Sequence, residues 1–286
     1  MSETETINLE QPQKPKSDVK TRVMTAIPAA LAVIGLLVFG SQTVLGLVVL
    51  AFALVGMHEY RNMFAGNGIN LNAPVLMGLT ILIGLGGTFG GVSGINAMLL
   101  LSVLAVLFFQ LLFTPRHEIA DLQEMGLYLF GVLWIGWSFN YLTPLKNLPQ
   151  GTALIFLLLL TIWASDSFAY FGGRAIGKTP LAPSISPKKT IEGSACGVIG
   201  SGLIGAIYSA LVLTHLNWWQ GAVIAVVIAV IGQMGDLVES KIKRVCHVKD
   251  SGTLFPGHGG VLDRVDGFLT TVPLFYYLVI LMEHVG

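Results

Sequence analysis

Residues 236–266 form the most polar segment of the chain and read DLVESKIKRVCHVKDSGTLFPGHGGVLDRVD. Charged side chains are denser here than anywhere else in the chain, of which only 11% is charged overall. Long apolar runs precede and follow the segment. A polar segment in such surroundings is either a cytosolic loop or a functional site.

The first part of this segment continues a membrane helix, because the apolar run 222–231 lies directly before it. At 3.6 residues per turn, Asp236, Ser240 and Lys243 fall on one face of that helix. An acidic residue is costly where a helix leaves the bilayer unless it faces a cavity, a partner or an ion. Asp236 is therefore a candidate site residue.

The second part of the segment combines a glycine-rich turn with a pair of acids. The turn, residues 255–260, brings backbone N–H groups and His258 close to whatever lies beside it. Asp263 and Asp266 follow, three residues apart, on one face of the helix that begins the last apolar run. Carboxylates from two helix ends, with cations around them, suit a divalent metal ion that holds phosphates.

The composition predicts an all-α, polytopic integral membrane protein. Of the 286 residues, 53% are hydrophobic, and the mean hydropathy of +0.74 is far above that of an ordinary soluble domain. The formal net charge of zero says little about partners. The two cysteines, Cys196 and Cys246, lack companion residues at the spacing of a zinc site, and we expect free thiols.

The apolar runs predict about nine transmembrane helices, since one crossing needs roughly 20 residues. The run 23–57 is too long for one helix and is expected to break at Gly40-Ser41-Gln42. The run 73–113 is expected to break at residues 90–94. The other five helices are predicted at about 126–141, 151–170, 194–213, 218–237 and 267–282.

The basic residues predict the orientation of these helices. With nine helices, one side of the membrane receives the N-terminal tail and the loops after helices two, four, six and eight. These segments hold 15 of the 16 lysines and arginines. Short cytosolic loops are enriched in Lys and Arg, so we expect this side, including the N-terminus, to be cytosolic. Only Lys146 lies opposite, and we expect its replacement to have little effect on function.

The chain then divides into three parts. Residues 1–22 mix Glu, Gln, Pro and Lys without an apolar run and predict a disordered cytosolic tail. Residues 23–145 form the N-terminal transmembrane helices. Residues 146–286 form a C-terminal transmembrane region that carries the site, with cytosolic loops at 172–193 and 238–266.

The polar segment resembles the signature of the CDP-diacylglycerol synthases, also called phosphatidate cytidylyltransferases. The family pattern is a Ser, then Lys-Arg, Lys-Asp, a small residue, a Pro-x-His-Gly-Gly turn and Asp-Arg-x-Asp. The matching residues here are Ser240, Lys243-Arg244, Lys249-Asp250, Gly252, Pro256 to Gly260, and Asp263-Arg264-Val265-Asp266.

Two earlier segments also resemble conserved stretches of this family. They are residues 166–173, which begin with Asp166, and residues 183–193, which contain Ser186-Pro187-Lys188-Lys189-Thr190. Ser167 stands where the family leads us to expect Thr, a conservative departure. The resemblance in motifs covers about residues 166–266, whereas the N-terminal half matches only in being helical and apolar. Residues 186–190 lack the Gly-x-x-x-x-Gly-Lys pattern, which excludes a P-loop.

The resemblance implies an enzyme of phospholipid biosynthesis. Such a nucleotidyltransferase transfers CMP from CTP to phosphatidic acid and yields CDP-diacylglycerol and pyrophosphate. The implied cofactor is Mg²⁺, with a second cation left open. The implied partners are CTP, phosphatidic acid, the lipid bilayer and a second copy of the chain in a homodimer, and no nucleic acid is expected. The implied location is the plasma or inner cell membrane, with the active site facing the cytosol.

The resemblance and the residue chemistry together assign roles to the polar residues of these segments. The expected metal ligands are Asp236, Asp263 and Asp266. The expected catalytic residues are Asp236, Ser240, Lys249, His258, Asp263 and Arg264. The residues expected to bind the nucleotide are Asp166, Ser186, Lys188, Lys189, Thr190, Lys243, Arg244, Gly259 and Gly260.

Simpler interpretations stay open for several of these residues. Lys241, Lys243 and Arg244 could contact anionic lipid headgroups as ordinary cytosolic residues. Asp263 could pair with Arg264, and either acid of the pair could cap the last helix. Asp166 could serve helix packing. Four further polar residues, namely Glu59, Arg61, Arg116 and His117, are expected at the membrane interface.

Two other functions also stay open. A CTP-using enzyme that acts on another lipid, such as an archaeal-type ether lipid or a polyprenol, would share the motif. An ion-coupled transporter would use Asp166 and Asp236 to carry its ion. Against the transporter, the acids cluster with cations on one membrane face rather than at mid-bilayer. Pyrophosphate release from CTP that depends on phosphatidate and magnesium would separate an enzyme from a transporter.

Overall fold

The computed structural model describes residues 19–113, 118–254 and 259–285. Most of the predicted tail therefore lies outside the described residues, and the last four residues of that tail already belong to a helix. The first two helices, α1 (Val19–Phe39) and α2 (Gln42–Ala65), are separated at Gly40 and Ser41, where the sequence predicts a break. Ser41 Oγ caps α2 by accepting a hydrogen bond from the Val44 N–H (3.3 Å).

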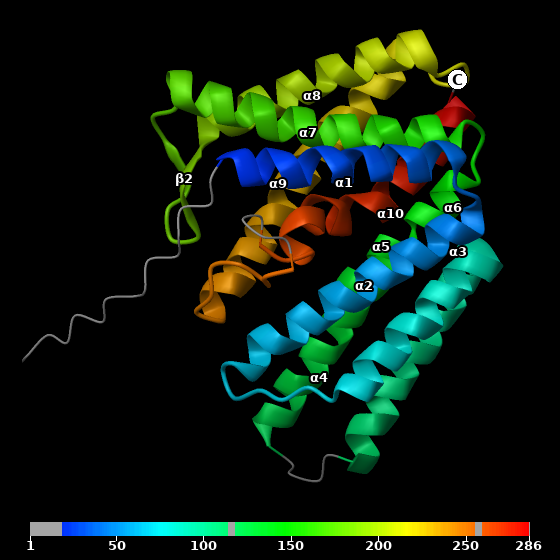
Figure 1. The fold of residues 1–286 in the computed structure, drawn as a ribbon, viewed down its shortest axis with the longest axis vertical. Helices are drawn as coiled ribbons and strands as arrows, with labels where there is room; N and C mark the ends of the chain where they lie inside the picture. The colour runs from blue at the N-terminus through cyan, green and yellow to red at the C-terminus, as the bar shows by residue number, and fades with distance from the viewer. Residues whose placement is uncertain (1–18, 114–117, 255–258, 286) are drawn as a thin grey trace, which may run out of the picture.

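The long helix α3 (Ala73–Phe113) consists of two limbs that meet at Gly91. Gly91 has φ 57° and ψ −148°, a conformation that residues with a side chain rarely adopt. This bend lies within residues 90–94, where the sequence predicts a break. Gly86 and Gly94 bring the two limbs into contact, since a Cβ on Gly94 would meet the Gly86 carbonyl. Figure 1 shows the limbs side by side.

The next helical segment is nearly continuous and longer than predicted. It comprises α4 (Ile119–Gly131), the π-helical η1 (Val132–Trp137), α5 (Ser138–Asn140) and α6 (Leu142–Lys146). Its early start has a local cause, because the Asp121 carboxylate accepts the Glu118 N–H (3.2 Å) in a capping box. The polar residues before position 126 thus begin a helix, although the sequence predicts a loop there.

The last four helices are α7 (Gly151–Ile176), α8 (Ile191–Val212), α9 (Trp218–Val245) and α10 (Leu262–Val285). α7, α8, α9 and α10 all extend into the segments predicted as cytosolic loops, 172–193 and 238–266. The loop between α9 and α10 is correspondingly shorter than predicted. The side chains at the ends of α9 and α10 are therefore held on rigid helices.

A small β-hairpin connects α7 to α8, and the sequence does not predict it. Its strands, β1 (Pro180–Ala182) and β2 (Ser186–Thr190), pair antiparallel. The Glu192 carboxylate holds the base of the hairpin by accepting the N–H groups of Lys178 (3.0 Å) and Thr179 (3.1 Å). The two neighbouring lysines of β2 are thereby presented from an ordered element.

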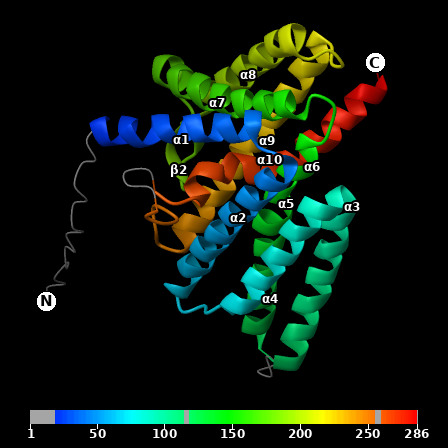
Figure 2. The same ribbon diagram turned by 45° about the vertical axis from the view of Figure 1, so that its right-hand side comes forward.

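The helices α9 and α10 lie at the centre of the molecule. Figures 1 and 2 show α7 and α8 on one side of them and α2 with α3 on the other, while α1 runs alongside α7. Glycines allow close approach around α8: a Cβ on Gly197 would meet the Ser165 carbonyl of α7 (2.7 Å), and a Cβ on Gly205 would meet the Gly221 carbonyl of α9 (2.5 Å). Small residues at such contacts are typical of membrane helices.

The described helices confirm a polytopic, all-α membrane protein. Six of them, namely α2, α3, α7, α8, α9 and α10, are long and apolar enough to cross a membrane. Large apolar side chains such as Phe89 (73% exposed) and Leu203 (59% exposed) cover the outer surface, whereas Tyr60 and Phe275 are fully buried. An apolar exterior is what lipid contact requires. The total of nine crossings and the cytosolic N-terminus stay predictions.

Lys146, which the sequence predicts on the far side of the membrane, connects three helices. From α6, its Nζ donates to the Leu37 carbonyl of α1 and to Thr152 Oγ1 of α7 (2.6 Å). Lys146 therefore has a structural role, and its position on the far side of the membrane stays a prediction.

Replacing Lys146 by Met is expected to lower the free energy of unfolding by about 1–3 kcal/mol, because the Leu37 carbonyl loses a charged donor. The melting temperature in detergent measures this loss. Lys241→Met is the matched control, since Lys241 is exposed, and should change stability by less than about 0.5 kcal/mol. Equal melting temperatures for the two variants would show that the bonds of Lys146 add no stability.

Candidate functional site

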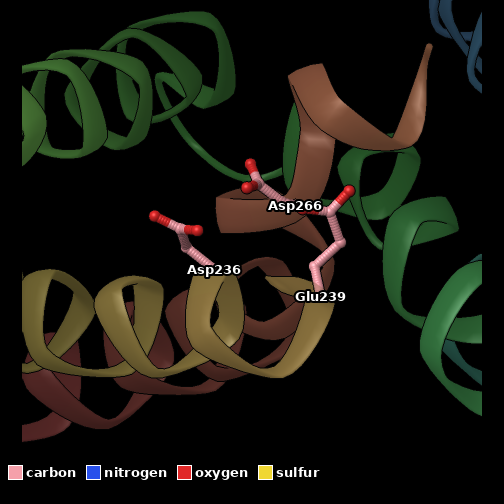
Figure 3. A group of neighbouring side chains, drawn as sticks. All are labelled: Asp236, Glu239 and Asp266. Atoms are coloured by element: carbon pink, nitrogen blue, oxygen red, sulfur yellow. The ribbon is translucent and has the colours of Figure 1, made fainter. Parts of the chain in front are cut away.

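Three carboxylates from α9 and α10 converge near the centre of the molecule. One oxygen from each of Asp236, Glu239 and Asp266 lies within 4.8 Å of the other two. Figure 3 shows the three side chains gathered between the two helices. Glu239 is 1% exposed, and the other two acids are partly buried. We call these three residues the acidic cluster.

Helix geometry and one glycine explain why these residues meet. Asp236 and Glu239 are three positions apart and so share a face of α9. Asp266 lies near the start of α10, which packs against that face. Gly235 permits the close packing, because a Cβ at this position would meet Thr270 Oγ1 of α10.

Two lysines lie against the acidic carboxylates. Lys189, on β2, forms an ion pair with Asp236 Oδ2. Lys243, one turn after Glu239 on α9, pairs with Glu239 Oε2 (2.6 Å) and with Asp263 Oδ1 (2.7 Å). The second oxygen of Glu239, Oε1, is buried and has no hydrogen-bond partner among the described residues. A buried carboxylate oxygen in this state is costly unless a cation binds it.

A cavity of about 130 Å³ adjoins the acidic cluster. Asp236 and Asp263 both line it, so the predicted convergence of the two helix ends is confirmed. Its other polar lining residues include Ser165, Asp166, Gln233 and Asp266, and its apolar lining residues include Ile162, Ile228 and Ala229. The acidic cluster beside this cavity combines three carboxylates with one unpartnered buried oxygen, and it fits a hard cation such as Mg²⁺.

Asp263 lies at the cavity with both of its oxygens bonded. Oδ1 accepts from Lys243, and Oδ2 accepts from the N–H groups of Ser251 (2.9 Å) and Gly260 (2.8 Å). Oδ2 also accepts a hydrogen bond from Ser251 Oγ (2.9 Å). The acidic cluster thus contains Glu239 in the place that the sequence predicts for Asp263. The role of Asp263 as a metal ligand stays a prediction.

Several of the predicted site residues contact this cavity or its acids. Asp166 lines the cavity from α7, and Lys189 contacts Asp236. Ser240 Oγ donates to Asp236 Oδ1 (3.3 Å), which confirms that these two residues share a helix face. These contacts join residues that the sequence separates by up to 74 positions, from Asp166 to Ser240.

Other predicted site residues do not line the cavity, or they lie outside the described residues. Thr190 Oγ1 caps α8 by accepting the Gly193 N–H (3.2 Å), a structural contact. Gly259 has φ 83°, which a residue with a side chain rarely adopts. His258 lies outside the described residues. Among the predicted site residues, Lys188, Arg244, Lys249 and Arg264 are exposed, and Ser186 is a partly buried residue of β2.

Two polar residues that α9 contributes to the site are absent from the predicted set. Glu239 is one of them, although its spacing of three from Asp236 is a sequence signal for a shared helix face. Gln233 is the other: its Nε2 donates to Ser165 Oγ (3.0 Å), and the Ser194 hydroxyl donates to its Oε1. Gln233 thereby joins α7, α8 and α9 beside the cavity.

Glu59, which the sequence predicts at the membrane interface, is a buried residue of α2. The Glu59 side chain, on α2, is only 6% exposed and lies inside the protein. Its carboxylate accepts hydrogen bonds from the N–H groups of Val261 (2.9 Å) and Leu262 (3.0 Å) at the start of α10. A contact over more than 200 positions leaves no local pattern in the sequence. Of the other residues predicted at the interface, Arg61 donates to the Leu71 carbonyl (2.8 Å).

The two cysteines are free thiols, as predicted. Cys246 is buried directly after α9, and this burial raises the pKa of its thiol. A buried thiol with a raised pKa is a poor nucleophile and a poor metal ligand. Neither cysteine lines the cavity.

The sequence is similar to those of known proteins over most of its length. A family model described as the cytidylyltransferase family matches residues 20–282. Among curated relatives, a phosphatidate cytidylyltransferase of Bacillus subtilis is 34% identical over 273 residues, covering 93% of this chain and 99% of that protein. Similar proteins of the same name in a Synechocystis species and in Staphylococcus epidermidis are each 34% identical, over 91% and 92% of this chain and 96% and 99% of their own lengths.

Proposed function

The chain belongs to the cytidylyltransferase family, and from this membership and the acidic cluster we propose a phosphatidate cytidylyltransferase. The enzyme transfers the cytidylyl group of CTP to phosphatidic acid. A phosphate oxygen of the lipid forms a bond to the α-phosphorus of CTP, and the bond from that phosphorus to the bridging oxygen breaks. The products are CDP-diacylglycerol and pyrophosphate, as phospholipid biosynthesis requires.

The reaction needs little help with proton transfer, but it needs strong stabilisation of negative charge. The attacking phosphate oxygen is already ionised at neutral pH, so no strong general base is needed. The two substrates are both highly anionic, and the reaction depends on aligning them and on stabilising charge at the α-phosphate. Fixed cations beside a cavity can meet both demands, and Lys189 and Lys243 lie in such positions.

The acidic cluster is the observation that carries the proposal for the cofactor. Asp236, Glu239 and Asp266 would hold Mg²⁺, and the unpartnered Glu239 Oε1 supports this ligand set. When bound, the ion would neutralise phosphate charge and fix the position of the triphosphate. We propose that Lys188, Lys189, Lys243, Arg244, Lys249 and Arg264 contribute to phosphate binding.

Pyrophosphate release tests this function directly. The purified protein in detergent should release pyrophosphate only when CTP, phosphatidic acid and magnesium are all present. A panel of other lipid phosphates, including an ether lipid and a polyprenyl phosphate, tests the rival lipid substrates. An ion-coupled transporter would release no pyrophosphate under any of these conditions, and that result would refute the proposal.

Lys189→Met is expected to lower kcat/KM for CTP about a hundredfold, because it removes a fixed cation from the cavity. Steady-state kinetics at saturating phosphatidic acid measure this change. Lys178→Met is the matched control, since its exposed side chain lies before the same hairpin, and it should keep kcat/KM within about twofold. Equal kinetics for the two variants would remove Lys189 from the site.

The multi-pass architecture and the bacterial relatives support a location in the plasma membrane. We propose that the cavity faces the cytosol, where CTP is present, and that the protein forms a homodimer. Labelling of an engineered cysteine at exposed Lys241 in inverted and right-side-out vesicles tests the orientation. Crosslinking in the membrane tests the dimer.

A further inference from the structure

Glu59 is a buried carboxylate without a role in the reaction as described so far. It belongs to α2, outside residues 166–266 that carry the family motifs, yet it contacts Ser251, Val261 and Leu262. The burial of a carboxylate is costly unless its oxygens are hydrogen-bonded, and here both oxygens are. Its partners indicate what it does.

Glu59 caps α10 from a distant part of the chain. Its Oε1 accepts the Val261 N–H (2.9 Å), and its Oε2 accepts the Leu262 N–H (3.0 Å). Because α10 begins at Leu262, these N–H groups have no acceptor inside the helix. A carboxylate at a helix N-terminus is also favoured by the helix dipole. The first turn of α10 is therefore held in place by α2.

Glycines around the carboxylate make room for this contact. A Cβ on Gly252 or on Gly260 would meet the carboxylate oxygens of Glu59. A Cβ on Gly56, one turn before Glu59, would lie 3.0 Å from Leu262 Cδ2. These three glycines therefore allow α2 to pack closely against the residues around Gly252 and Gly260.

Ser251 connects Glu59 to the cavity. Its Oγ lies 3.1 Å from Glu59 Oε2 and 2.9 Å from Asp263 Oδ2, and its single proton is donated to one of them at a time. Asp263 Oδ1 binds Lys243, whose Nζ also binds Glu239 of the acidic cluster. A continuous chain of polar contacts therefore runs from α2 to the acidic cluster.

We propose that Glu59 is a positioning residue for the cytidylyl transfer. From α2 it fixes the start of α10 and Ser251, so that Asp263 and Asp266 face the acids of α9 across the cavity. It does not touch the substrates, and its effect is exerted through these residues. The activity part of the following test depends on the function proposed above, whereas the binding part does not.

Glu59→Gln tests the proposal, because it keeps the side-chain volume but turns one acceptor into a donor that opposes a backbone N–H. The magnesium concentration for half-maximal activity is expected to rise about tenfold, with a fall in kcat. A second measurement needs no turnover: the magnesium concentration that produces half of the metal-induced rise in melting temperature should shift by the same factor. Ser251→Ala should shift both midpoints in the same direction by less.

Two controls separate positioning from general stability. Lys146→Met should lower the melting temperature without moving either magnesium midpoint. Glu283→Gln, a matched change at the opposite end of α10 where Glu283 contacts His215 (3.1 Å), should leave both midpoints unchanged.

The proposal is overturned if Glu59→Gln and Ser251→Ala lower the melting temperature but keep both magnesium midpoints of the wild type. Where Glu59→Gln does not fold, Ser251→Ala alone decides in the same way. Absence of pyrophosphate release by the wild type would instead count against the proposed function. The melting-temperature midpoints would still decide the role of Glu59 in that case.

Discussion

Asp236→Asn is expected to lower the rate of CDP-diacylglycerol formation about a thousandfold. The substitution removes a charge from the acidic cluster, and the amide left behind no longer pairs with Lys189. It should also abolish the magnesium-induced rise in melting temperature, because a hard cation prefers charged oxygen ligands. Transfer of labelled CMP from CTP to lipid measures the first effect, and thermal melting in detergent measures the second.

Asp121→Asn is the control for this variant. Asp121 caps α4, and the same chemical change there should cost about 1 kcal/mol of stability with no loss of transfer. Retention of more than a tenth of the wild-type rate in Asp236→Asn would contradict a role for Asp236 at the metal and the triphosphate.

The second large effect concerns Glu239 and Asp263. The sequence predicts Asp263 as a metal ligand, whereas the acidic cluster contains Glu239 instead. Glu239→Gln and Asp263→Asn are each expected to reduce turnover about a thousandfold with the protein still folded and inserted. Only Glu239→Gln should abolish the magnesium-induced rise in melting temperature, since Glu239 belongs to the acidic cluster. Asp263→Asn should retain a weakened rise, because Asp263 binds Lys243 and backbone N–H groups.

If Asp263→Asn abolished the magnesium-induced rise in melting temperature and Glu239→Gln only weakened it, Asp263 would be a metal ligand and Glu239 would not. Unchanged turnover in Asp263→Asn would show that its contacts with Ser251 and Lys243 serve stability alone. Both measurements can be made on the same detergent preparations, so a difference in protein quality cannot mimic the result.

The sequence predicts much of the helical architecture because the breaks are local. Gly40 and Ser41 separate two helices by a cap, and Gly91 bends α3 through a backbone conformation that suits glycine. Helix ends are predicted less well. α7 and α10 continue into polar residues, since a polar side chain can remain on a helix when tertiary contacts satisfy it.

The candidate site is likewise predicted only in part. Asp236, Asp263 and Asp266 are predicted from their spacing on two helix ends, and the cavity between those ends agrees with this pattern. Glu239 carries a spacing signal as well, but its burial with an unpartnered oxygen is visible only in three dimensions. The hairpin that contains β2 and the buried position of Glu59 depend on tertiary contacts, which periodicity and motif spacing do not reveal.

The contact between Glu59 and the start of α10 also bears on how the protein is made. The ribosome completes α2 about 200 residues before it reaches Leu262. Until then the Glu59 carboxylate has neither of its two backbone donors, and a charged group without partners is costly inside a bilayer. The contact that fixes the first turn of α10 can therefore form only after nearly the whole chain has been synthesised.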